Sequence, residues 1–397
     1  MDKKISRREL FRYAGAAGVA ALLGSRFAGA AETAPAPAAE LPKVPRRVLG
    51  KTKETVPILL VGGSMKFDPA FDPRLAEAMR FGVNYIDTAD CYAGGASEIG
   101  VGGFLEKTGK RKDVWITTKT DRHDPEGATR TLQQSLERMK TDHVDLWFLH
   151  ALQEEKWLSP DMAKTADQLK KEGKIRFFGF SCHDGNVAEL ISRAAELGWI
   201  DAIMYRYNFR EYGNEKLNKA MDAAHKAGVG LIAMKTQGSA VSFEDGVKKF
   251  QEKNFSKQQA VLKAVWADER ISAAVSHMDT LDKMKSNIAA ALDKTALAEN
   301  DILELQRYAE ATQHLYCAGC QHLCNQAVPA GIEIGTTLRY LMYHDSYTDR
   351  DKARELFADL PAASRQFEGV DFSKASALCP HKIDIARHMQ RAAEVLA

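Results

Sequence analysis

The sequence predicts an α/β protein: a closed (β/α)8, or TIM, barrel followed by a small, mostly helical domain. Apolar strands alternate eight times with amphipathic helices over about 245 residues, which is the usual size of such a barrel. Polar side chains stand at the ends of several of these strands. The alternation stops in the last quarter of the chain, where four of the six cysteines are found. A chain of 397 residues is long enough for such an arrangement.

The first thirty residues read as an export signal. Arg7 and Arg8 follow Ser6, an Ala/Gly-rich run covers 13–24, and Ala28-Gly-Ala30 offers a small-residue cleavage site. This order of regions is typical of a twin-arginine signal, and the apolar run is too short to span a bilayer. We therefore expect a periplasmic, or otherwise extracytoplasmic, protein with no transmembrane anchor once residues 1–30 are removed. Residues 31–46 form a Pro/Ala linker.

The barrel is expected over residues 47–298. Strands are predicted where short β-branched and aromatic runs occur, at 58–62, 84–87, 114–119, 144–149, 175–180, 202–205, 229–234 and 272–275. Helices are predicted between them from apolar residues on one face and from glycines after the last turn, at 74–81, 98–108, 128–139, 161–172, 187–197, 216–227, 256–267 and 281–291. A doubly wound open sheet is the rival. Its Gly-rich turn after the first strand is missing, since 61–65 read Val-Gly-Gly-Ser-Met.

Four polar residues follow three successive strands. Asp87 ends the second strand and Tyr92 follows it, Lys119 ends the third, and His150 comes directly after the fourth. In a barrel these positions converge on the face that carries chemistry. A tyrosine has an unperturbed pKa of about 10, and a nearby ammonium would make its proton easier to give. The set suits proton donation to a carbonyl oxygen while a hydride reaches the carbonyl carbon.

Each of the four has a structural alternative. Tyr92 could pack on the barrel rim, Asp87 could cap the next helix, Lys119 could be solvated, and His150 could be a rim histidine. Their joint occurrence at successive strand ends favours the catalytic interpretation.

These residues occur in motifs that resemble the aldo-keto reductase family. The motifs follow the family's order: Arg47-Val-Leu-Gly-Lys-Thr52, Ile86-Asp-Thr-Ala-Asp-Cys-Tyr92, Lys119, Phe148-Leu-His150, Gly179-Phe-Ser181, Tyr207-Asn208, Ile232-Ala-Met-Lys235 and Asn287. The resemblance implies that Tyr92 is the general acid, that Lys119 and Asp87 tune it, and that His150 orients the carbonyl.

The resemblance also implies an NADP(H) cofactor bound without a Rossmann turn. The residues at matching cofactor positions are Ser181, Lys235, Gly238, Lys283 and Asn287. Three positions depart from the family's usual residues: Cys182 replaces an Asn, Met204 a Gln, and Met234 an aromatic residue. Cys91 and Cys182 follow strand ends, so a disulfide between them is conceivable.

The domain expected at 299–397 contains a metal-ligand pattern. Cys317, Cys320 and Cys324 give C-x₂-C-x₃-C, and Cys379 precedes a proline. This resembles bacterial ferredoxin ligation of a [4Fe–4S] cluster, although the third gap is one residue longer than usual. Structural zinc and two disulfides are the alternatives. Helices are predicted at 337–342 and 350–360, and a subgroup of aldo-keto reductases has a similar extension.

The sequence therefore predicts an exported, NADP-dependent oxidoreductase that interconverts carbonyls and alcohols and contains a [4Fe–4S] cluster. Its partners would be a small carbonyl or alcohol substrate and a redox partner protein. With 55 basic and 53 acidic residues, the chain has no charge excess that would favour nucleic acid. The alternatives are an electron-transfer protein with tightly bound or no nicotinamide, and a non-catalytic binding module stabilised by the cluster.

Overall fold

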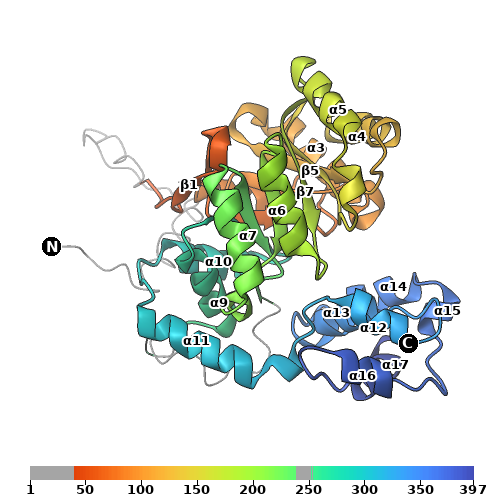
Figure 1. Cartoon of the computed structure of the whole chain (residues 1–397). Coiled ribbons are helices and arrows are strands. Elements are labelled where there is room, and N and C mark those ends of the chain that lie inside the picture. The colour runs from red at the N-terminus through yellow and green to blue at the C-terminus, as the bar shows by residue number, and fades with distance from the viewer. Residues whose placement is uncertain (1–39, 238–251, 253) are drawn as a thin grey trace, which may run out of the picture. The chain divides into compact units, whose positions relative to one another are not determined.

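The computed structural model describes residues 40–237, 252 and 254–397. The predicted export signal at 1–30, most of the linker and Gly238 lie outside these described residues. Leu41–Ala397 forms one compact unit, coloured from red to blue in Figure 1. Within the described part of the chain, no helix is both long and apolar enough to cross a membrane.

A short antiparallel hairpin precedes the barrel. It consists of β1 (Arg46–Val48) and β2 (Thr55–Pro57). The Lys51 amide between them donates to the carbonyl of Gly228, just before the strand Gly230–Met234 begins. The hairpin therefore packs at the end of the barrel opposite the carboxyl ends of the strands. The sequence prediction did not include it.

Eight parallel strands close into a barrel, as predicted. Their order is β10-β3-β4-β5-β6-β7-β8-β9, with every neighbouring pair parallel. Their bounds are β3 (Leu59–Gly62), β4 (Tyr85–Asp87), β5 (Trp115–Thr120), β6 (Val144–Leu149), β7 (Ile175–Cys182), β8 (Ala202–Arg206), β9 (Gly230–Met234) and β10 (Ile271–His277).

Helices follow the strands and begin at residues that favour a helix start. Asp72, Asp124 and Ser159 accept hydrogen bonds from the first turns of their helices, and a proline occupies the first helical position each time. The helix bounds are α2 (Pro73–Arg80), α3 (Ala96–Thr108), α4 (Pro125–Met139), α5 (Pro160–Lys171), α6 (Val187–Leu197), α7 (Glu215–Lys226), α9 (Lys257–Ala267) and α10 (Leu281–Leu292).

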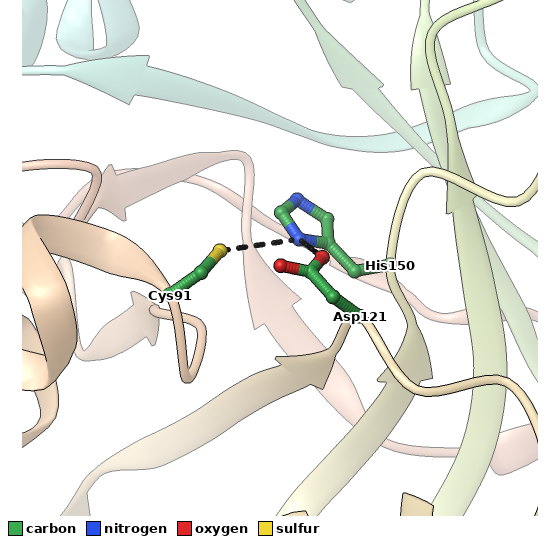
Figure 2. A group of neighbouring side chains, drawn as sticks. All are labelled: Cys91, Asp121 and His150. Carbon is green, nitrogen blue, oxygen red and sulfur yellow. Dashed lines mark hydrogen bonds and ion pairs between the residues drawn. The ribbon is translucent and has the colours of Figure 1, made fainter. Parts of the chain in front are cut away.

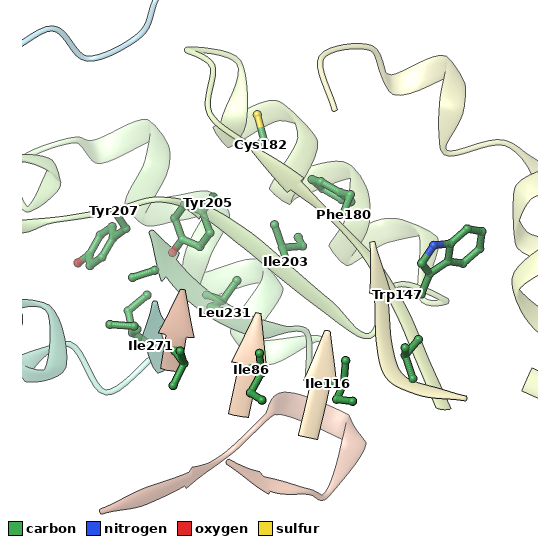
Figure 3. Close-up of a cluster of buried hydrophobic side chains, with 14 of the residues drawn as sticks. Ile86, Ile116, Trp147, Phe180, Cys182, Ile203, Tyr205, Tyr207, Leu231 and Ile271 are labelled. Carbon is green, nitrogen blue, oxygen red and sulfur yellow. The ribbon is translucent and has the colours of Figure 1, made fainter. Parts of the chain in front are cut away.

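Alternating strand residues build two apolar layers. Ile86, Ile116, Ile203 and Leu231 belong to the larger core, in which strand side chains meet the surrounding helices (Figure 3). The strand residues next to these in sequence point to the other side of the sheet. They include Tyr85 and Phe148 and form a second cluster inside the barrel. This two-sided burial explains why the strands read as nearly continuous apolar runs.

Residues 299–397 are largely helical and contain a separate apolar core. Ile334, Phe357 and Met389 are among its buried members. The helices are α11 (Glu299–Ala311), α12 (Gln321–Cys324), α13 (Ile334–Asp345), α14 (Arg350–Ala358), α15 (Ala362–Arg365), α16 (Ser373–Leu378) and α17 (Ile385–Leu396). The predicted helices at 337–342 and 350–360 correspond to α13, which is longer than expected, and to α14.

Candidate active site

The four predicted catalytic residues meet at the carboxyl ends of β4, β5 and β6. Asp87 is the last residue of β4, Lys119 lies in β5, and His150 directly follows β6. Tyr92 begins a 3₁₀ turn, Tyr92–Gly95, in which Ala93 and Gly94 have positive φ angles of 50° and 60°. From the start of this turn the Tyr92 hydroxyl contacts Lys119.

Lys119 is the centre of the constellation. Its Nζ lies 2.7 Å from Asp87 Oδ1 and donates to Tyr92 Oη at 3.3 Å. It also donates to the Thr88 carbonyl at 2.7 Å. Lys119 and Asp87 are only 1% and 2% exposed, so the pair is shielded from solvent. The ring of His150 lies edge-on to that of Tyr92, with 5.6 Å between centroids.

The electrostatics of Tyr92 differ from the sequence prediction. Burial, followed by the negative charge of Asp87, raises the pKa of Tyr92 well above its ordinary value. The phenol is therefore not more acidic than usual, in contrast to the sequence prediction, because burial and the charge of Asp87 prevail. The ammonium of Lys119 lies closer to Asp87 Oδ1, at 2.7 Å, than to Tyr92 Oη, at 3.3 Å. Tyr92 consequently holds its proton at neutral pH.

His150 contacts two residues that the sequence analysis did not assign to the site. Its Nδ1 lies 2.7 Å from Asp121 Oδ1 and 3.6 Å from Cys91 Sγ (Figure 2). His150 holds the pKa of Asp121 below its usual value, although burial opposes this. Asp121 could have been predicted from the sequence as a site residue, because it is the first residue after the strand β5.

The predicted cofactor residues do not form one cluster. The Ser181 hydroxyl accepts from the Ala151 amide at 3.0 Å, which anchors the loop after β6. Lys283 pairs with Asp279 at 2.8 Å in the first turn of α10. On the same helix Asn287 donates to Ser276 and accepts from Gln237. Gly238 lies outside the described residues.

Lys235 contacts the C-terminal helices. Its Nζ donates to Tyr343 Oη of α13 at 2.5 Å, and its φ angle is 58°. Lys352 of α14 also donates to the backbone carbonyl and hydroxyl of Ser64, after β3. Sequence reasoning missed these contacts, which join residues more than a hundred positions apart.

The four tail cysteines line a single cavity. Cys317, Cys320, Cys324 and Cys379 surround it together with apolar residues such as Ile385. Burial and the neighbouring Cys317 raise the pKa of Cys320 to about 11 and that of Cys324 to about 12. Four thiols around one space fit a group that is held by four thiolates.

None of the six cysteines, all of which lie in the described part of the chain, forms a disulfide. The conceivable Cys91–Cys182 bridge is not formed: Cys91 is exposed beside His150, and Cys182 is buried. Two tail disulfides are likewise not formed.

Two curated proteins illustrate the similarity to known sequences. An uncharacterized oxidoreductase, YqkF of Bacillus subtilis, is 26% identical over 280 residues, which cover 62% of this chain and 88% of that protein. The L-galactose dehydrogenase of Arabidopsis thaliana is 24% identical over 311 residues, which cover 69% of this chain and 97% of that protein.

Solved structures share the barrel. The holo form of aldo-keto reductase AKR11C1 from Bacillus halodurans has a TM-score of 0.54 and 22% identity, covering 66% of this chain and 96% of that one. A Klebsiella pneumoniae aldo-keto reductase in complex with NADPH has a TM-score of 0.54 and 21% identity, and the match covers 68% of this chain and 95% of that one. The family model for aldo/keto reductases matches residues 61–309, more than half of the sequence. The chain belongs to the aldo/keto reductase family.

Proposed function

We propose that this chain interconverts a small carbonyl compound and its alcohol by hydride transfer, with Tyr92 as the general acid. The observation that carries this proposal is the position of Lys119 Nζ, which contacts both Asp87 Oδ1 and Tyr92 Oη at the barrel mouth. The side chains that the chemistry requires are in mutual contact there.

The proton movements follow from these contacts. In reduction, the carbonyl carbon gains a hydride and its oxygen gains the proton of Tyr92, which gives the alcohol. The phenolate that remains is stabilised by the ammonium of Lys119, and Asp87 keeps that ammonium in place. His150, edge-on to Tyr92, orients the carbonyl oxygen. In alcohol oxidation the same proton returns to Tyr92.

NADP(H) is the proposed cofactor, and it would supply the hydride. The chemistry of the predicted donors suits a phosphorylated dinucleotide: Lys235 and Lys283 are cationic, and Lys283 and Asn287 lie on α10, whose first-turn amides favour anions. Ser181 and Gly238 complete the proposed set. The NADPH complex of the Klebsiella pneumoniae reductase supports this choice.

A [4Fe–4S] cluster is the group proposed for Cys317, Cys320, Cys324 and Cys379, and structural zinc is the alternative. The cavity that these thiols share supports the cluster rather than zinc, because these described cysteines are not among the groups whose ligand atoms lie within 4.8 Å of one another, as the ligands of a single ion do. The Cys379-Pro380 pair and the C-x₂-C-x₃-C spacing favour the cluster, which would carry single electrons.

The remaining organisation is proposed from the sequence. A twin-arginine signal at 1–30 would export the folded protein to the periplasm or another extracytoplasmic compartment, followed by a linker at 31–46. The barrel domain would cover 47–298 and the cluster domain 299–397.

The test of the proposed chemistry is Tyr92→Phe, which removes one hydroxyl. We expect carbonyl reduction with NADPH to fall by about 10²–10⁴-fold, while NADPH binding and the circular dichroism spectrum stay unchanged. Tyr205→Phe is the matched control, because the Tyr205 hydroxyl is buried in the core without a hydrogen-bond partner among the described residues. Equal turnover in wild type and Tyr92→Phe would refute the mechanism.

A second candidate function is electron transfer between the barrel site and a redox partner, with nicotinamide tightly held or dispensable. The contact between Lys235 and Tyr343 favours it, because a predicted cofactor residue is engaged by the C-terminal helices. Denaturing the purified protein and assaying the released NADP(H) separates the candidates. Cofactor that exchanges freely with added NADPH before denaturation contradicts tight retention.

A further inference from the structure

Three side chains of different chemistry converge on one point beside the proposed active site. We call Cys91, Asp121 and His150 the rim cluster. Their ligand atoms, one thiol sulfur, one carboxylate oxygen and one imidazole nitrogen, all lie within 4.8 Å of one another. They come from the segments that follow β4, β5 and β6, and Figure 2 shows Cys91 and Asp121 both directed at the same edge of the His150 ring.

Hydrogen bonding links the three side chains through Asp121. His150 Nδ1 lies 2.7 Å from Asp121 Oδ1 and 3.6 Å from Cys91 Sγ, and the carboxylate can accept from both the imidazole and the thiol. A cation between the three atoms can replace both of these protons, because each atom then acts as an electron-pair donor.

The spacing fits a tetrahedral cation. Zinc with bonds of about 2.3 Å to sulfur and about 2.0–2.1 Å to nitrogen and oxygen places a sulfur and a nitrogen ligand about 3.6 Å apart, and a nitrogen and an oxygen about 3.3 Å apart. The observed sulfur–nitrogen distance is 3.6 Å. The nitrogen–oxygen distance of 2.7 Å must open by roughly half an ångström. The Asp121 side chain, 52% exposed, is free to make this small movement.

The surrounding charge also favours a cation. Asp90 lies next to Cys91, and its Oδ1 is buried without a hydrogen-bond partner among the described residues. The nearby ammonium of Lys119 is paired with Asp87. A thiolate and an imidazole select zinc over the harder magnesium and calcium ions.

We propose that the rim cluster binds one thiophilic divalent cation, Zn²⁺, through Cys91 Sγ, Asp121 Oδ1 and His150 Nδ1, with the fourth position open. Coordination through Nδ1 leaves the imidazole proton on Nε2. This consequence rests on the proposed function, because a protonated Nε2 is the form of His150 that can donate to a carbonyl oxygen. The binding itself is independent of Tyr92.

The test is a Co²⁺ titration of the full chain, purified without air so that the tail cysteines keep their group. In wild type we expect the near-ultraviolet band of a thiolate bonded to cobalt and the visible bands of tetrahedral Co²⁺. Cys91→Ser should lose the thiolate band of this site and bind at least about 100-fold more weakly, since even changes next to a ligand cost roughly 10–100-fold. Asp121→Asn should also bind more weakly.

Cys182→Ser is the control, because Cys182 is buried after β7 and is not part of the rim cluster. It should bind cobalt as wild type does. Cobalt taken up by the tail cysteines is common to all variants and cancels in difference spectra. Equal spectra and affinities in wild type and Cys91→Ser overturn the proposal. Tyr92→Phe should lose reduction but retain cobalt binding, so failure of the metal site and failure of the proposed mechanism are distinguishable.

Discussion

Lys119 and Asp87 form an ion pair that is almost completely removed from solvent. Such a pair depends on both partners, because an unpaired buried charge is far more costly than the pair itself. We expect Lys119→Met to lower the free energy of unfolding by about 3–5 kcal/mol, since Asp87 would remain buried without its counter-charge. Urea denaturation followed by circular dichroism measures this change.

The control is the double variant Asp87→Asn/Lys119→Met, in which neither charge remains. It should be more stable than Lys119→Met alone. If the double variant is the less stable of the two, the two charges do not depend on each other in this way.

Tyr92 should ionise only at strongly alkaline pH. Burial and Asp87 raise its pKa, so the folded protein keeps the phenol protonated beyond its ordinary pKa of about 10. The proposed general acid for reduction is therefore not lost as the pH rises through neutrality. A tyrosinate absorbance titration, taken as wild type minus Tyr92→Phe, should show this residue ionising above about pH 10. A difference signal that appears below about pH 9 contradicts the pKa direction that the structure gives.

The sequence predicted the meeting of Asp87, Lys119 and His150 because parallel strand ends share one face of a barrel. It could not predict which way side chains beyond the strand ends point. Tyr92 reaches Lys119 from a turn beyond the end of its strand, and Asp121 was not predicted to belong to the site. The contact between Lys235 and Tyr343 could not be predicted from the sequence, since the two residues are 108 positions apart.

At the scale of elements, long segments were predictable and short ones were not. The predicted barrel strands and helices lie within a few residues of the observed ones, because each has enough apolar residues to show its period. The hairpin β1–β2 was missed because its strands have only three residues each. Helices α11 and α17 were not delimited either, although the domain was expected to be helical.

Strand β7 approaches β8 so closely that one position accepts only glycine. A Cβ on Gly179 would lie 1.8 Å from the carbonyl oxygen of Ala202, which is backbone and cannot turn away. We expect Gly179→Ala to destabilise the barrel by about 1–3 kcal/mol or more, as overpacking does. The midpoint and slope of urea unfolding give the measurement.

Gly213→Ala provides the comparison. A Cβ at this loop position before α7 meets nothing within 4 Å, so its effect should stay within about 0.5 kcal/mol. Equal stability of the Gly179 and Gly213 variants would mean that the β7–β8 pairing tolerates a side chain.

At the scale of the whole molecule, the barrel and the C-terminal helices have separate apolar cores. The tail core includes Ile334, Phe357 and Met389, and Cys317, Cys324 and Cys379 pack against it. A metal group held by these cysteines would add to this core, because the free energy of binding at a structural metal site is also free energy of folding. The contacts from Lys352 to Ser64 and from Tyr343 to Lys235 add only local support.

Loss of the metal group proposed for the tail should therefore loosen the tail and leave the barrel folded. We expect Cys379→Ser to make residues 312–397 more accessible to protease and to hydrogen exchange, because one ligand of the proposed group is gone and its contribution to folding is lost. The barrel amides of β5 and β6, buried on both faces, should stay protected. Cys91→Ser is the matched control, since Cys91 is exposed at the rim and does not line the tail cavity. If the tail amides of Cys379→Ser exchange as slowly as those of Cys91→Ser, apolar packing is sufficient to hold the tail, and the four cysteines are not needed for its stability.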